Sequence, residues 1–93
     1  MVVITENAVM VIRDLAAQEG SPHSAGVRIA ADPSGDSLTI ETTDQPAPGD
    51  RVVENQGARL FLDSDAAELL EDKALDASVD EEGDVQFAIM EVP

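Results

Sequence analysis

The sequence predicts a small α+β, β-rich domain with one main N-terminal helix, one short helix and hairpins forming a small mixed sheet or β-sandwich. Three observations predict this class. Apolar residues recur at helical spacing over residues 5–19. Two β-rich runs within residues 46–63 are joined by a short loop that ends in glycine, which is a strong hairpin signal. Near the C-terminal end, apolar and polar residues alternate, as in a half-buried strand. With 93 residues, we expect one domain, 1–93.

The N-terminal part of the chain predicts a short extended segment followed by the main helix. Val2–Ile4 is apolar and β-branched, and it either pairs as an edge strand or packs under the helix. Thr5 is expected to cap the helix, and Gly20 and Pro22 are expected to end it. The apolar stripe of this helix is Ala8, Ile12, Leu15 and Ala16.

The middle of the chain predicts two hairpins. Gly26–Ala31 and Ser37–Thr43 alternate as strands around a turn over Asp32–Asp36, in which Pro and Gly favour chain reversal. Asp44–Asp50 is then an ordered connector, too short for a domain linker. In the second hairpin, which we regard as the centre of the fold, the strands are Arg51–Glu54 and Ala58–Leu62, and the loop is Asn55–Gly57.

The remaining segments predict a short helix and a closing pair of extended segments. Asp63 or Ser64 can cap the helix, which is expected to place three apolar residues on one side, Ala66, Leu69 and Leu70. The later segments are an extended run (Leu75–Val79), an acidic turn (Asp80–Asp84), a strand containing Val85, Phe87 and Ile89, and a frayed tail (Glu91–Pro93).

The charge of the chain is extreme and restricts its partners. Five basic and 20 acidic residues give a formal net charge of −15. Such a field repels phosphate backbones and anionic lipid, so binding to nucleic acid or to a membrane surface is disfavoured. It is compatible with basic protein partners or cations, and also with an acidic surface that only keeps the protein in solution. The small size of the domain favours a homodimer or another partner.

The absence of cysteine excludes thiol catalysis and any cysteine-ligated metal or cluster on this chain. No long apolar run suggests a membrane span or a secretory signal, so a cytoplasmic protein is the default expectation.

Six segments follow one another along the chain: I-T-E-N-A at Ile4–Ala8, G-V-R-I at Gly26–Ile29, P-G-D-R-V-V-E-N-Q-G-A-R-L-F-L-D at Pro48–Asp63, the leucine-containing short helix, L-D-A-S-V-D at Leu75–Asp80, and the closing V-Q-F-A-I. In this order they resemble the HesB/IscA-like family of A-type iron–sulfur cluster carriers. Together they span nearly the whole chain. The resemblance implies a compact β-rich domain with one main helix and a shorter one, often assembled as a dimer or larger.

The resemblance also implies where the chemistry of the family would lie. Active members hold iron or a cluster through three cysteines, one in a Cys-Ser-Gly turn after the second strand and two in a Cys-x-Cys tail. Here the turn is Pro33, Ser34 and Gly35, with proline in place of the thiol, and the sequence ends at Pro93 before such a tail. We therefore expect no bound cluster, no metal and no other cofactor, and only the scaffold of the family.

No other group of residues predicts an active site. His23 is the only histidine and is expected to be exposed in its loop, while Arg28 and Arg59 are expected on the surface or in ion pairs. Three clusters of acidic residues could bind a hard cation, but they are better explained as parts of turns and helix caps. These clusters are Asp32 with Asp36, Asp63 with Asp65, and Asp80 with Glu81, Glu82 and Asp84.

These observations predict a protein without catalytic residues that is not an enzyme. The leading hypothesis is a cysteine-less HesB/IscA-like scaffold that acts through protein–protein contact, in a regulatory or accessory role in iron–sulfur cluster assembly. Its partner would be basic or an assembly factor. The alternative is a protein that binds iron or another divalent ion through carboxylates, with or without His23.

Overall fold

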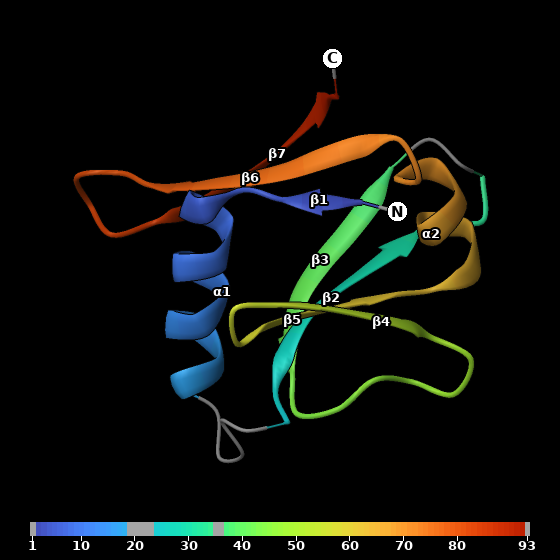
Figure 1. Cartoon of the computed structure of the whole chain (residues 1–93), viewed down its shortest axis with the longest axis horizontal. Coiled ribbons are helices and arrows are strands. Elements are labelled where there is room, and N and C mark those ends of the chain that lie inside the picture. Colours follow the sequence, from blue (N-terminus) through green and yellow to red (C-terminus); the bar gives the residue numbers. More distant parts are fainter. Residues whose placement is uncertain (1, 19–23, 35–36, 93) are drawn as a thin grey trace.

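The chain folds into two mixed β-sheets with a helix on either side of them (Figure 1). The computed structural model describes residues 2–18, 24–34 and 37–92. Within these residues the elements are β1 (Val3–Ile4), α1 (Glu6–Ala17), β2 (Gly26–Ala31), β3 (Leu38–Thr43), β4 (Arg51–Asn55), β5 (Ala58–Leu62), α2 (Ser64–Leu69), β6 (Lys73–Val79) and β7 (Val85–Glu91). The predicted β-rich α+β class is confirmed.

Thr5 begins α1 and also fastens the helix to β6. Its side chain accepts a hydrogen bond from the backbone N–H of Ala8, as an N-cap does, and its hydroxyl donates to Asp76 Oδ1 at 2.6 Å. Its own N–H donates to the Leu75 carbonyl oxygen at 3.0 Å. The predicted cap is confirmed, but α1 ends at Ala17 rather than at residue 19. The predicted stop signals, Gly20 and Pro22, lie outside the described residues.

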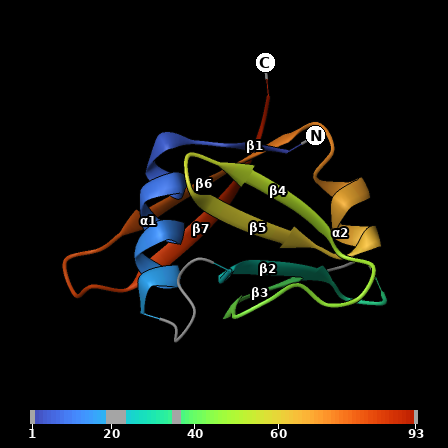
Figure 2. The same ribbon diagram turned by 60° about the horizontal axis from the view of Figure 1, so that its bottom comes forward.

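Both predicted central hairpins form, and a parallel contact joins them into one sheet of order β3-β2-β5-β4 (Figure 2). In this contact Val27 pairs with Leu60, and Ile29 pairs with Leu62. Because side chains alternate along a strand, these four residues lie on the same face of the sheet. All four are at most 2% exposed, so this face forms the centre of the core.

The loop of the second hairpin is shorter than the predicted three residues. Asn55 pairs with Ala58 across the two strands, which leaves only Gln56 and Gly57 in the turn. Both have positive φ, 52° and 88°, as a type I′ turn requires. The prediction was wrong because asparagine is common in turns, whereas Asn55 is held in the strand by its pairing with Ala58.

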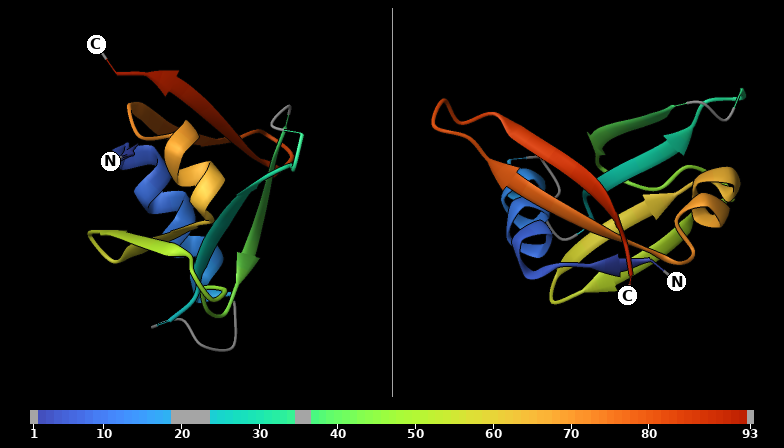
Figure 3. Two further views of the ribbon diagram at one scale, coloured as in Figure 1. Left: turned by 90° about the vertical axis from the view of Figure 1, so that its right-hand side faces the viewer. Right: turned by 90° about the horizontal axis from the view of Figure 1, so that it is seen from above.

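The second sheet, of order β1-β6-β7, contains the N-terminal and C-terminal strands. Of the two alternatives for the N-terminal segment, the edge strand is observed, since β1 pairs parallel to β6. The predicted frayed tail is wrong at Glu91, which ends β7 and binds Lys73 Nζ at 2.9 Å through Oε1. The turn between β6 and β7 extends past α1, as Figure 3 shows.

The short helix α2 lies on the side of the molecule opposite to α1 (Figure 1). Asp63 rather than Ser64 is its cap, because the Asp63 carboxylate accepts from the Ala66 N–H at 2.7 Å. Leu69 is 47% exposed, contrary to the predicted apolar side, while Leu70 is buried. Leu70 follows the last helical residue as the C-cap, where the backbone leaves the helical conformation, and it is buried while Leu69 faces solvent. Across the described part of the chain, no helix is long and apolar enough to span a bilayer.

Candidate functional site

The turn between β2 and β3 contains Pro33 and Ser34, at the place predicted from the cysteine-containing turn. Asp32 organises this turn, since its Oδ1 accepts from the Ser34 N–H at 3.3 Å and its Oδ2 accepts from the Ser37 hydroxyl at 3.3 Å. The Asp32 N–H also donates to the Ser37 carbonyl oxygen at 2.9 Å. The Asp32 carboxylate is therefore used within its own turn. Gly35 lies outside the described residues.

Pro33 and Ser34 line a pocket of about 350 Å³ between this turn and α2. Its wall on the helix side is formed by Asp65, Glu68 and the exposed Leu69. The proline ring offers an apolar surface with no thiol and no backbone N–H, so it cannot act as a ligand or as a donor. The pocket therefore has an apolar surface beside the carboxylates of Asp65 and Glu68, and its lining contains no thiol.

Asp63 connects three elements through hydrogen bonds to its Oδ1 and from its backbone N–H. Besides capping α2, its Oδ1 accepts a longer hydrogen bond from the Ala31 N–H, at 3.4 Å, and its own N–H donates to the Ile29 carbonyl oxygen at 3.2 Å. Asp63 thus ties the end of β5 and the start of α2 to β2. Asp65, its predicted companion, lies in the first turn of α2, where a negative charge is favourable.

The acidic turn between β6 and β7 is also organised by its first carboxylate. Asp80 Oδ1 accepts from the N–H groups of Glu82 and Asp84, both at 2.9 Å, and Gly83 provides the positive φ of 88°. Within residues 2–18, 24–34 and 37–92, no three His, Asp or Glu side chains converge as a metal-binding group. The predictions for His23 and Asp36 concern residues outside the described ranges.

The least exposed ion pair of the described residues joins Arg28 on β2 to Asp50 at the end of the connector. Arg28 Nε lies 2.8 Å from Asp50 Oδ2, and Arg28 Nη2 lies 3.0 Å from Oδ1, so the pair is bidentate. The Asp50 side chain is only 2% exposed and also accepts from the Ala47 N–H at 2.9 Å. The ion-pair interpretation of Arg28 is confirmed, and so is that of Arg59, which binds Glu54 at 2.7 Å.

The contact shifts the pKa values of both Arg28 and Asp50. The hydrogen bonds from Arg28 hold the pKa of Asp50 below its ordinary value, against the opposing effect of burial, and the Ala47 N–H adds to the lowering. The same hydrogen bond raises the pKa of Arg28. The sequence contains a signal for half of this arrangement, because Pro48 and Gly49 are typical of a type II turn that ends at residue 50. The Asp50 N–H does close that turn on the Ala47 carbonyl oxygen, at 3.0 Å.

Among the comparisons with known proteins, only the comparison with solved structures finds similar proteins. No protein-family model matches the chain, and no curated protein matches it. Among solved structures, it is similar to Escherichia coli SufA, described as involved in the biosynthesis of iron–sulfur clusters, with a TM-score of 0.78 and 23% identity over 97% of this chain and 84% of SufA.

Two further solved structures agree with this match. One is IscA with a 2Fe–2S cluster, with a TM-score of 0.70 and 25% identity over 98% of this chain and 85% of that one. The other is an Aquifex aeolicus protein, with a TM-score of 0.73 and 26% identity over 96% of this chain and 89% of that one. The similarity extends over nearly the whole chain in each case, as the sequence resemblance predicted. The chain therefore has the HesB/IscA-like fold, built from a sequence without cysteine.

Proposed function

We propose that this protein is a non-enzymatic scaffold that acts through protein–protein contact as an accessory to iron–sulfur cluster assembly. The observation that carries the proposal is the combination of a fold shared with SufA and IscA over at least 97% of the chain with the complete absence of cysteine. A partner that recognises this scaffold could dock on it, while cluster ligation by thiolate is unavailable to it.

The turn beside α2 supports the loss of the ligand. Pro33 has no side-chain donor atom, and the nearby Asp32 carboxylate is used by the turn itself. Carboxylates are also hard ligands that suit calcium, magnesium or manganese better than an iron–sulfur cluster. The net charge of −15 adds a reason for a basic partner, because opposite charge accelerates encounter and disfavours acidic competitors.

Two measurements test the proposal. The first is anaerobic reconstitution with iron and sulfide, followed by absorption spectroscopy and metal analysis, with E. coli SufA treated identically as the positive control. We expect a cluster chromophore for SufA and none for this chain. A stable chromophore here would overturn the cysteine-less scaffold. Calorimetry with ferrous, manganous and calcium ions extends the test, and binding tighter than millimolar would instead favour the carboxylate metal-binding alternative.

The second measurement concerns the partner. The tagged protein is used to capture proteins from the native lysate of its own organism, and the bound fraction is compared with that of an unrelated protein of similar size and charge. Enrichment of iron–sulfur assembly proteins over this control is the expected result. If both proteins capture the same set, the contact is only electrostatic and the accessory role is wrong.

A further inference from the structure

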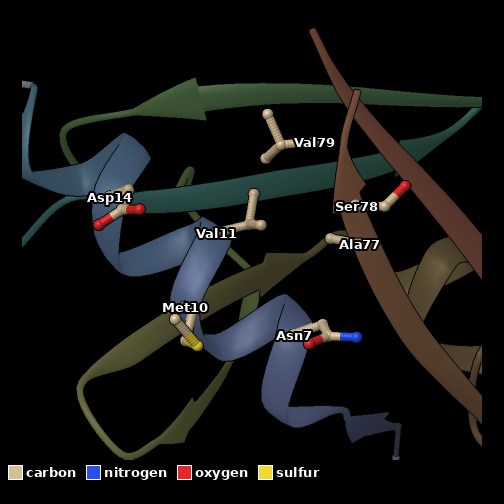
Figure 4. A pocket seen from close by; sticks show the side chains of 7 residues that line it. All are labelled: Asn7, Met10, Val11, Asp14, Ala77, Ser78 and Val79. Atoms are coloured by element: carbon tan, nitrogen blue, oxygen red, sulfur yellow. The ribbon is translucent and has the colours of Figure 1, made fainter. Parts of the chain in front are cut away.

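A groove of about 340 Å³ lies between α1 and β6, and Figure 4 shows the side chains that line it. In Figure 1, α1 lies on the side of the molecule away from α2. Met10 and Val79, on opposite walls, are the two most exposed large hydrophobic side chains of the described residues, at 65% and 55%. Val11 and Ala77, both buried, form its base. The rest of the lining is polar: Asn7, Asp14 and Ser78. Because each wall exposes a large apolar side chain to water, the groove is a candidate contact surface.

Carboxylates border this apolar strip on two sides. Glu6 and Asp14 lie four residues before and after Met10, so all three occupy one face of α1, and Asp14 lines the groove. On the other wall, Val79 leads directly into the exposed acidic turn Asp80–Asp84, which the structure places beyond α1 (Figure 3). The groove therefore has an apolar centre with negative charge on both sides.

Most of the basic side chains of the described residues form ion pairs away from the groove. Among the described residues, four of the five Lys and Arg side chains are in ion pairs away from the groove: Arg28, Arg51, Arg59 and Lys73. The fifth, Arg13, lies near Gly57 in the turn of the second hairpin and also lines a neighbouring pocket with Met10 and Asp14. The described residues show no ion pair for Glu6, Asp14, Glu81 or Glu82. With one basic side chain nearby, the charge around the groove is still predominantly negative.

We propose that this groove binds a basic amphipathic helix of a partner protein. Its apolar residues would contact Met10 and Val79, and Lys or Arg one helical turn to either side would meet Glu6 and Asp14. The inference rests on the proposed function, because it assigns a surface to the partner contact. A second copy of this chain is a poorer occupant, since it brings another −15 charges, and nucleic acid and anionic lipid are repelled for the same reason.

The test uses the whole 93-residue chain and a labelled synthetic peptide of Ala, Leu and Lys in which each Leu has Lys four residues away on both sides. Binding is followed by fluorescence anisotropy and located by amide chemical shifts. A scrambled peptide of the same composition controls for charge alone. We expect the ordered peptide to bind more tightly than the scrambled one and to shift the amides of α1 and β6. Equal affinity for both peptides, or shifts confined to other elements, would overturn the proposal.

Two substitution pairs sharpen the test. Met10→Lys places a charge in the groove, while Val52→Lys makes the same change of charge at an apolar residue on β4 that is 49% exposed. M10K should weaken peptide binding at least about tenfold and V52K less than about twofold. Asp14→Asn should weaken it by about two- to fivefold, against no measurable change for Asp65→Asn on α2. Equal effects within either pair would refute the groove.

The outcomes separate this inference from the proposed function. If M10K captures the assembly proteins from lysate as well as the unmodified protein does, the accessory role stands and the groove is refuted. If the unmodified protein captures none, yet the peptide binds in the groove and M10K abolishes that binding, the groove stands and the accessory role is refuted. Sedimentation tests the remaining occupant, because a dimer of this chain that M10K disperses would assign the groove to a second copy and overturn the proposal.

Discussion

Substitution of Arg28 by glutamine should destabilise the protein by about 3 kcal/mol. The change removes two charge-assisted hydrogen bonds, of 2.8 and 3.0 Å, and leaves Asp50 with only the Ala47 N–H. Loss of one partner from a buried ion pair typically costs about 3–5 kcal/mol, because the other charge is left without compensation. The lower end applies here, since the Arg28 side chain is 22% exposed while that of Asp50 is 2% exposed.

Urea denaturation measures this cost directly, and thermal unfolding should show a fall in Tm of about 12–24 °C for a domain of this size. Arg51→Gln is the matched control. It makes the same change in net charge, but Arg51 and Glu71 are 57% and 61% exposed and 3.9 Å apart, so we expect less than about 0.5 kcal/mol. If R28Q costs no more than R51Q, the connector is not held by this ion pair.

The pH dependence provides an independent check with a defined sign. Arg28 lowers the pKa of Asp50 in the folded protein below its ordinary value of 3.8. Asp50 therefore contributes stability above that value and loses it as the pH falls through the folded-state pKa. The difference in unfolding free energy between the unmodified protein and R28Q should be largest near neutral pH and should shrink under acid conditions. A difference that is unchanged in acid would contradict the electrostatic explanation.

Two structural predictions accompany this one. Gly26→Ala should cost about 3 kcal/mol or prevent folding, because a Cβ there would collide with the Arg59 carbonyl oxygen. Gly49→Ala meets no neighbouring atom and should cost only about 1 kcal/mol for its positive φ. Urea midpoints should rank the two variants in this order, and the reverse order would refute the collision. Asp63→Ala should cost about 1–2 kcal/mol through loss of the α2 cap, and Asp63→Asn, which keeps an oxygen acceptor for the Ala66 N–H, should retain most of the stability by the same assay.

Local sequence patterns predicted most of the elements correctly, because the signals for a helix, a strand or a turn lie in the residues of that element. Helical spacing and Thr5 identified α1, alternation around a Pro/Gly turn identified the first hairpin, and two β-rich runs joined by a loop ending in glycine identified the second. Errors came where a tertiary contact overrode local composition. Asn55 was predicted in a loop but is held by pairing with Ala58, and Glu91 was predicted in a tail but is held in β7 opposite Lys73.

The candidate site was predictable only in part. The position of Pro33 and Ser34 in the turn after β2 agrees with the sequence prediction, since that turn is local. The groove was not predicted, because Met10 and Val79 are far apart in the chain and Met10 by itself resembles an ordinary exposed helical residue. Likewise, Pro48 and Gly49 indicate a turn that ends at Asp50, but they contain no information about its partner Arg28.

By itself, the sequence determined the absence of thiol ligands, the net charge of −15 and the identity of the helix and hairpin segments, since these depend only on which residues are present and how they are spaced. Only the tertiary structure decided the parallel pairing of β2 with β5, the Arg28–Asp50 contact and the apolar groove between α1 and β6. Each of these joins residues distant in sequence, and such pairs are selected by the free energy of packing the whole chain rather than by the preferences of any one segment.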